Sequence, residues 1–239
     1  MTFVSPKGGK SPCDPASIEA FKDDEGCKKF FADDEAQKLV NETGKLSDVK
    51  AADFDAVFYP GGHGPVVDLA FDEVSFKLIN DFYASGKIVS AVCHAPAVFV
   101  NVKLPDGTPF IQGKKFAGFT NEEEEQAQGA ALVPFLLETE LTKQGGIHEK
   151  VDAWGVKVVV DDSGKSTVLT GQNPASAGVC PFARHYSLAP SLTILSSLAS
   201  LSPRSSRSSL LKPHALPCQT CCSPIDDPLH DILAELTSA

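Results

Sequence analysis

The strongest candidate for chemistry in this 239-residue chain is Cys93, which directly follows the apolar run Ile88–Val92. A short run of this kind, rich in β-branched residues, predicts a buried strand. The residues after Cys93 include Pro96, which is tolerated in the first turn of a helix. The sequence therefore predicts a strand-to-helix turn with the thiol at its tip, the place of the nucleophile in a nucleophile elbow.

The residue after Cys93 is His94, a candidate base for the thiol. A thiol at a helix N-terminus also lies near unpaired N–H groups and the positive end of the helix dipole, and both favour the thiolate. The backbone N–H of His94 would point the same way and help to stabilise an oxyanion. The alternative is a structural cysteine, because free cysteines are among the most buried residues. The adjacent histidine favours the nucleophile.

A second motif, Tyr-Pro-Gly-Gly-His-Gly-Pro at residues 59–65, also follows an apolar run. In an open parallel sheet the carboxyl ends of the strands meet at one edge, where ligands bind. Gly61 and Gly62 would let backbone N–H groups approach a substrate and donate to an oxyanion, with His63 beside them. The alternative is a tight turn that needs glycine for its own geometry. The Lys-Ser/Thr ending of a phosphate-binding loop is missing, so phosphate binding is not expected.

A third motif places four glutamates, residues 122–125, directly after Thr120-Asn121. Acidic residues in the first turn of a helix complement its dipole, and this suffices to explain at least three of them. One glutamate could instead turn inward and orient His94, as the acid of a catalytic triad does.

Around these motifs the sequence alternates between strands and helices. Amphipathic spacing predicts helices over 74–84 and 122–142, the second interrupted near Pro134. This alternation predicts an α/β fold, a parallel sheet with helices on both faces. Strands are predicted from apolar runs bounded by Gly, Pro or Asp at residues 55–59, 88–92, 156–160 and 167–170.

The composition changes near residue 178, after which Ser, Leu and Pro dominate. The sequence therefore predicts a domain over 1–177 and a poorly ordered tail over 178–239, with one short helix at 228–236. The tail contains one CxxC pair, Cys218 and Cys221, without a second pair at zinc-finger spacing. These cysteines are interpreted as solvated thiols and no metal site is expected.

The overall charge excludes several classes of partner. The formal net charge is −10 and no basic stripe is present, which argues against nucleic acid and anionic membranes. No apolar segment approaches the roughly 18 residues of a membrane helix, and the N-terminus lacks the apolar region of a signal peptide. Seven cysteines, an odd number, do not suggest a disulfide framework. We therefore expect a protein of the reducing cytosol, with the nucleus left open.

Four motifs in order resemble the ThiJ/PfpI group of the class I glutamine amidotransferase-like superfamily. They are Tyr-Pro-Gly-Gly-His-Gly, Ala-Val-Cys-His-Ala-Pro-Ala, Gly-Phe-Thr-Asn-Glu and Thr-Gly-Gln-Asn-Pro-Ala-Ser-Ala, which begin at residues 59, 91, 118 and 170. The likeness is greatest to the fungal glutathione-independent glyoxalases, the glyoxalase III or D-lactate dehydratase enzymes, which are also described as heat-shock chaperones. The resemblance covers residues 1 to about 177 and implies a flavodoxin-like fold.

The resemblance also implies a site and a reaction. By position Cys93 would be the nucleophile, His94 its partner and Glu124 the triad acid. The reaction implied is the conversion of methylglyoxal and water to D-lactate, with no cofactor and no metal, in a protein that forms a homodimer. The resemblance also implies three residues that would line the pocket and donate to the oxyanion: Gly61, Gly62 and His63.

Two departures from the family pattern keep other functions open. Family members begin with an extra strand and helix before the segment that matches residues 2–6, and this piece supplies a central strand and a glutamate that hydrogen-bonds the cysteine. After residue 177 the family continues with a packing helix, which Pro181 would interrupt here. The alternatives are a stress chaperone, a redox sensor or an inactive truncated homologue. An amidotransferase or peptidase has weaker support.

Overall fold

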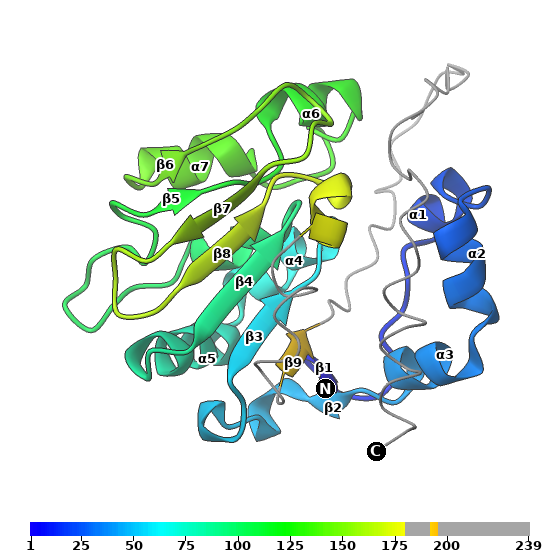
Figure 1. Cartoon of the computed structure of the whole chain (residues 1–239), viewed down its shortest axis with the longest axis horizontal. Coiled ribbons are helices and arrows are strands. Elements are labelled where there is room, and N and C mark those ends of the chain that lie inside the picture. The colour runs from blue at the N-terminus through cyan, green and yellow to red at the C-terminus, as the bar shows by residue number, and fades with distance from the viewer. Residues whose placement is uncertain (180–191, 196–239) are drawn as a thin grey trace.

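A seven-stranded sheet forms the centre of the computed structural model, which describes residues 1–179 and 192–195 (Figure 1). The strand order is β2-β1-β9-β3-β4-β8-β7, and every neighbouring pair is parallel except the antiparallel pair β8 and β7. The strands are β1 (Thr2–Ser5), β2 (Gly44–Lys45), β3 (Ala56–Tyr59), β4 (Ile88–Val92), β7 (Val158–Asp161), β8 (Val168–Gly171) and β9 (Leu192–Leu195). A separate parallel pair joins β5 (Lys115–Phe116) to β6 (Ile147–His148).

The helices that shape the site are short. The longest α-helix of the described residues, α5, begins at the N-cap Asp72 and buries Leu78, Ile79 and Phe82. The elbow after β4 enters a 3-10 helix, η4 (Ala95–Phe99), and η5 (Pro174–Val179) follows β8. The α-helices are α1 (Pro15–Ala20), α2 (Glu25–Ala32), α3 (Asp34–Asn41), α4 (Gly64–Val67), α5 (Glu73–Ala84), α6 (Asn121–Gln126) and α7 (Leu137–Lys143).

The central strands are buried almost throughout. Every residue of β8 is buried, and in β4 only Ile88 is partly exposed. Strands that are covered on both faces are mostly apolar and do not alternate with polar residues, and the run Ala-Val-Phe-Tyr of β3 follows this pattern. The predicted α/β fold with a mostly parallel sheet is therefore confirmed, and the carboxyl ends of β3 and β4 open at the same edge.

Two expected elements differ from the structure. The strands predicted at 156–160 and 167–170 form the antiparallel hairpin of β7 and β8, because the short turn between them cannot carry the crossover that parallel strands need. The helix predicted over 122–142 is two short helices, α6 and α7, separated by ten residues that include Gly129 and Pro134.

A larger correction concerns the tail, of which the structure describes residues 178, 179 and 192–195. Leu192–Leu195 form β9, which pairs in parallel with β1 on one side and with β3 on the other. For these four residues the structure replaces the expected poorly ordered tail with a strand inside the sheet. The reason is that β1 and β3 would otherwise face each other with unpaired N–H and C=O groups, which a short β-prone segment satisfies.

The remaining expectations for the tail lie outside the described residues. They include the CxxC pair of Cys218 and Cys221 and the helix at 228–236. The division of the chain at residue 177 stays a prediction. Within residues 1–179 and 192–195, no helix combines the length and the apolar character that crossing a membrane requires.

Replacing Thr193 with proline should lower the free energy of unfolding by about 1–3 kcal/mol. Proline removes a backbone N–H from a strand that is paired on both sides, and it leaves a carbonyl of a neighbouring strand without its partner. Urea unfolding followed by circular dichroism measures the change. Thr193→Val keeps the N–H and should unfold like the wild type. An unchanged free energy of unfolding in Thr193→Pro would contradict the place of β9 in the sheet.

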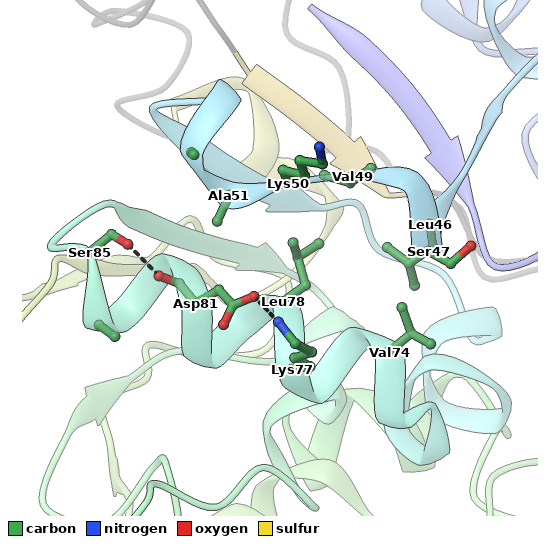
Figure 2. Close-up of a pocket in the computed structure, with 12 residues that line it drawn as sticks. Leu46, Ser47, Val49, Lys50, Ala51, Val74, Lys77, Leu78, Asp81 and Ser85 are labelled. Carbon is green, nitrogen blue, oxygen red and sulfur yellow. Dashed lines mark hydrogen bonds and ion pairs between the residues drawn. The ribbon is translucent and has the colours of Figure 1, made fainter.

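A surface groove of about 540 Å³ lies between α5 and the segment that carries η1 (Leu46–Asp48) and η2 (Ala51–Asp53) (Figure 2). Lys77 Nζ and Asp81 Oδ2 form an ion pair of 2.5 Å there, and Ser85 Oγ donates to the Asp81 carbonyl at 2.7 Å. None of the residues that line this groove is a predicted site residue, so the groove is separate from the site described next.

Candidate active site

Cys93 sits on a strained turn at the carboxyl end of β4. Its φ is 64°, in the left-handed region that residues with a side chain seldom adopt. Two hydrogen bonds hold this conformation: the Cys93 N–H donates to the Gly171 carbonyl, and the Cys93 carbonyl accepts from the Phe119 N–H, both at 2.9 Å. Strain that its surroundings hold in place in this way is typical of functional sites.

The glycine turn after β3 packs directly against this cysteine. A Cβ atom on Gly61 would lie 2.7 Å from the Cys93 Cβ and 3.1 Å from the Val92 carbonyl oxygen, so only glycine fits here. Gly62 has a φ of 88°, which also favours glycine. The backbone N–H groups of Gly62 and His94 both hydrogen-bond the Cys93 sulfur. The second predicted motif and the thiol are therefore in contact.

His94 connects the thiol to a carboxylate. Its Nδ1 lies 3.4 Å from the Cys93 Sγ, and its Nε2 lies 2.5 Å from Oε2 of Glu124. Because the carboxylate accepts a hydrogen bond from Nε2–H, the lone pair of the neutral imidazole is on Nδ1 and faces the thiol. All three side chains are buried. The structure thus brings Cys93, His94 and Glu124 into one connected row.

Burial and hydrogen bonding set the charges in this row. Burial lowers the pKa of His94 and outweighs the hydrogen bond to Glu124, which raises it, so the imidazole is neutral near pH 7. Burial also acts to raise the pKa of Glu124, but the hydrogen bonds from His63 and His94 prevail and lower it to about 2. The site therefore pairs a neutral imidazole with an ionised carboxylate, as a general base and its orienting acid require.

His63 completes the group from the other side of Glu124. Its Nε2 lies 3.3 Å from Glu124 Oε1, and its ring centroid is 4.2 Å from that of His94. The ring of Phe119 contacts His94 as well, with centroids 4.1 Å apart. The His63 side chain is 27% exposed, against 3% for His94 and Glu124. His63 is therefore the member of the group that solvent or a small ligand meets first.

Comparison with known proteins adds the family. Residues 22–177 match the DJ-1/PfpI family. The chain belongs to the DJ-1/PfpI family.

Two curated fungal relatives are similar to this DJ-1/PfpI chain. Glyoxalase 3 of Candida albicans is 34% identical over 142 residues, 56% of this chain and 57% of the relative. The glutathione-independent glyoxalase HSP31 of Saccharomyces cerevisiae is 30% identical over 155 residues, 61% and 62% of the two chains. The chain thus spans about three fifths of these relatives.

Solved structures share the architecture of this chain. The Rapid Encystment Protein 24 KDa of Francisella tularensis aligns with a TM-score of 0.68 and 32% identity over 76% of this chain and 78% of its own. Glyoxalase III of Candida albicans aligns with a TM-score of 0.56 and 23% identity over 74% of this chain and 92% of its own, which shows a shared fold. These alignments confirm the predicted flavodoxin-like fold. Together with the family match, they also confirm the predicted resemblance to the ThiJ/PfpI group.

One buried residue of this DJ-1/PfpI site was missed in the sequence. Glu123 is fully buried and forms a capping box with Thr120 at the start of α6. Its Oε1 accepts hydrogen bonds from the Trp154 N–H at 2.8 Å, from Gln172 Nε2 at 3.1 Å and from Asn173 Nδ2 at 2.8 Å. Glu123 therefore links the motif that begins at residue 118 to the motif that begins at residue 170, one residue before Glu124 in the chain. The Thr-x-x-Glu spacing is the signal that predicts such a cap.

The four glutamates divide into an exposed pair and a buried pair. Glu122 and Glu125 are exposed, whereas Glu123 and Glu124 are buried. Glu124 is the one that contacts His94, and Glu123 also turns inward, although as the N3 residue of the capping box it still serves the start of the helix. The reason is that the first turn of α6 packs against the loops after β4 and β8, which provide polar partners for two carboxylates.

The expectation of an acidic thiol was wrong. Burial raises the pKa of Cys93 to about 12, even though the N–H groups of Gly62 and His94 oppose this, and the charges of Glu123 and Glu124 raise it further. The helix after the elbow is a five-residue 3-10 helix, so its dipole contributes little. The resting thiol is therefore protonated, and the thiolate must form as the proton passes to His94.

This pKa predicts slow chemical modification of Cys93. With a chelator present, iodoacetamide should alkylate Cys93 more slowly at pH 7 than it alkylates the exposed Cys13. Because the thiolate fraction grows about tenfold per pH unit below the pKa, the rate should keep rising well above pH 9. Peptide mapping by mass spectrometry gives both rates. A rate at Cys93 that levels off between pH 6 and 8 would contradict the raised pKa.

Proposed function

We propose that this chain is a glutathione-independent glyoxalase that converts methylglyoxal and water to D-lactate. The observation that supports it most is the row Cys93–His94–Glu124, a thiol 3.4 Å from the acceptor nitrogen of a neutral imidazole whose other nitrogen faces an ionised carboxylate. Curated relatives that are 30–34% identical are named glyoxalases, which supports the same reaction.

The first step is attack of Cys93 on the aldehyde. As the Sγ–C bond forms, the thiol proton passes to His94 Nδ1 and the carbonyl oxygen takes the negative charge. Glu124 holds the imidazole in the tautomer that can accept this proton and stabilises the imidazolium that results. The N–H groups of Gly62 and His94, which hydrogen-bond the resting sulfur, lie beside the reacting carbon and would donate to the oxyanion. Return of the proton to that oxygen gives a hemithioacetal.

The next steps move a proton between two carbons. A base, His94 or a carboxylate of the group, removes the proton from the former aldehyde carbon and an enediolate forms. Reprotonation of the neighbouring carbon gives the thioester of lactate, in which the former aldehyde carbon is oxidised and the former ketone carbon reduced. Water then cleaves the thioester and restores the thiol, so no external oxidant or reductant is consumed. His63, partly exposed at this group, would contact the substrate oxygens.

This mechanism requires neither a cofactor nor a metal, and it places the enzyme among the lyases of the D-lactate dehydratase type. The proposed partner is a small dicarbonyl, and nucleic acid and membrane partners are not proposed. A homodimer and a cytosolic or nuclear location belong to the same proposal. A redox-sensing role has less support, because sensor cysteines have lowered pKa values and that of Cys93 is raised.

The close packing of Gly61 on the thiol gives this proposal a sensitive point. Gly61→Ala should lower the rate of lactate formation by about 100-fold, because the new methyl would displace Cys93 from its geometry by a fraction of an ångström or more. Steady-state assays measure the loss. Gly26→Ala, where an added Cβ meets only the end of the Asp24 side chain, is the matched control and should keep full activity. Equal rates in both variants would exclude close packing at Gly61 as a requirement.

The experiment that tests the function is an assay of the purified full chain with methylglyoxal and no glutathione. Lactate is quantified with a D-lactate-specific dehydrogenase after methylglyoxal is removed. Formation of D-lactate in proportion to enzyme and time is the expected result. If methylglyoxal remains, or is lost only into arginine and lysine adducts, the proposed function is wrong.

A further inference from the structure

We propose that His63, His94 and Glu124 also form a binding site for a divalent cation of borderline softness, such as Zn²⁺ or Co²⁺, and that a cation bound there blocks the thiol chemistry. Metal binding is independent of the proposed glyoxalase reaction, whereas the inhibition rests on it. The site would make the activity of this chain sensitive to the free concentration of such a cation.

The geometry of the three side chains supports the site. One ligand atom from each residue lies within 4.8 Å of the other two. Both histidines turn Nε2 toward the same carboxylate, at 3.3 Å for His63 and 2.5 Å for His94. Tetrahedral zinc with ligands at about 2.0–2.2 Å separates its ligand atoms by about 3.3–3.5 Å. Changes of about 1 to 1.5 Å in these separations are therefore enough to admit the ion between the three atoms.

The chemistry of the ligand set also fits. Two imidazoles and one carboxylate are the ligands of many catalytic zinc sites, with one position left open. Within the described residues, Glu124 forms ion pairs only with His63 and His94. Neither lysine nor arginine competes for the carboxylate there. Glu123 lies buried next to it and adds negative potential. His63 and His94 stand at the N-caps of α4 and η4, and Glu124 lies in the first turn of α6.

Bound metal would remove the base from the mechanism. A cation on Nε2 of His94 takes the lone pair that this nitrogen would expose, and the single proton of the neutral ring then resides on Nδ1. That nitrogen faces Cys93 at 3.4 Å and could no longer accept the thiol proton. The Cys93 sulfur lies on the Nδ1 side of the ring, away from the ligand nitrogen, so the thiol is not part of the ligand set. The fourth position remains open to water.

Titration of the full chain with Co²⁺ tests the site through visible absorption. The titration uses the variant Cys180→Ser, Cys218→Ser, Cys221→Ser, Cys222→Ser, which removes the thiols of the C-terminal region as rival ligands. The expected result is one Co²⁺ per chain, with the ligand-field bands of a low-coordinate nitrogen and oxygen site and without a thiolate-to-cobalt charge-transfer band. Zn²⁺ should displace the Co²⁺ and erase the bands.

Variants decide which residues hold the ion. His63→Gln and Glu124→Gln should each weaken Co²⁺ binding at least about tenfold. Cys93→Ser and His148→Gln, which removes a histidine outside the group, should leave it unchanged. Circular dichroism verifies that each variant is folded, and His63→Asn replaces any that is not. Absence of stoichiometric binding, a charge-transfer band that disappears in Cys93→Ser, or undiminished binding in both ligand variants would overturn the proposal.

The effect on catalysis is measured separately. Zn²⁺ at the concentration that displaces Co²⁺ should abolish lactate formation, and a chelator should restore it. If the chain binds Co²⁺ as described and lacks glyoxalase activity without metal, the proposed function fails and the site stands. If the chain is active and metal binding is absent, the site fails and the function stands.

Discussion

Cys93→Ser is expected to lower the rate of D-lactate formation by at least about 10³-fold. A hydroxyl is a far weaker nucleophile and a weaker acid than a thiol, and His94 Nδ1 would have to take its proton without further help. Serine is close in size to cysteine and is compatible with the buried elbow, so the fold should be retained. Steady-state rates with saturating methylglyoxal measure the loss, and the thermal midpoint measures the stability.

Cys27→Ser is the matched control for this substitution. Cys27 is a half-buried cysteine of α2, outside the group around His94, and the same exchange there should leave the rate unchanged. Turnover that persists in Cys93→Ser at more than about a tenth of the wild-type rate would contradict the role of the thiol. A loss of rate in Cys27→Ser as well would indicate that the assay reports on folding rather than on the site.

Glu124→Gln is expected to lower the rate by about 10²–10⁴-fold. The carboxylate accepts a hydrogen bond from the Nε2–H of His94 at 2.5 Å and thereby leaves Nδ1 free to accept from the thiol. An amide can donate its own N–H to Nε2, which moves the ring proton to Nδ1 and removes the base. The same steady-state assay, with the wild type and the variant at several pH values, shows the loss.

Glu125→Gln provides the matched comparison, because it makes the same chemical change one residue further along α6. Glu125 is exposed, and its neutralisation should alter the rate by less than about twofold. A loss of similar size in both variants would show that the total negative charge of the glutamates in α6 determines activity, rather than the contact of Glu124 with His94. Such a result would remove Glu124 from the proposed triad.

Local sequence patterns predicted the parts of the site that local structure builds. The run Ile88–Val92 matches β4 at both ends, because its length of five residues and its β-branched side chains favour a buried strand over a helix. The turn after β4 holds Cys93 in a strained conformation. Position 61 must be glycine because the backbone there packs closely against Cys93. The placement of His94 beside Cys93 needed only their adjacency in the chain.

Long-range packing determined what the sequence did not predict. The strand at 192–195 is set by the open edges of β1 and β3, which lie far away in sequence. The raised pKa of Cys93 depends on its burial, to which many segments contribute and which no local spacing encodes. The inward turn of Glu123 depends on partners around residues 154 and 172–173, which the topology brings to α6.

Capture of the covalent intermediate is the sharpest test of Cys93 as the nucleophile. The full chain is mixed with methylglyoxal, quenched in acid during turnover and digested, and the peptide that carries Cys93 is weighed by mass spectrometry. This peptide is expected to gain the mass of one methylglyoxal and to return to its free mass once the substrate is consumed. D-lactate formed at the full rate while the Cys93 peptide stays unmodified at every time point would contradict this role of Cys93.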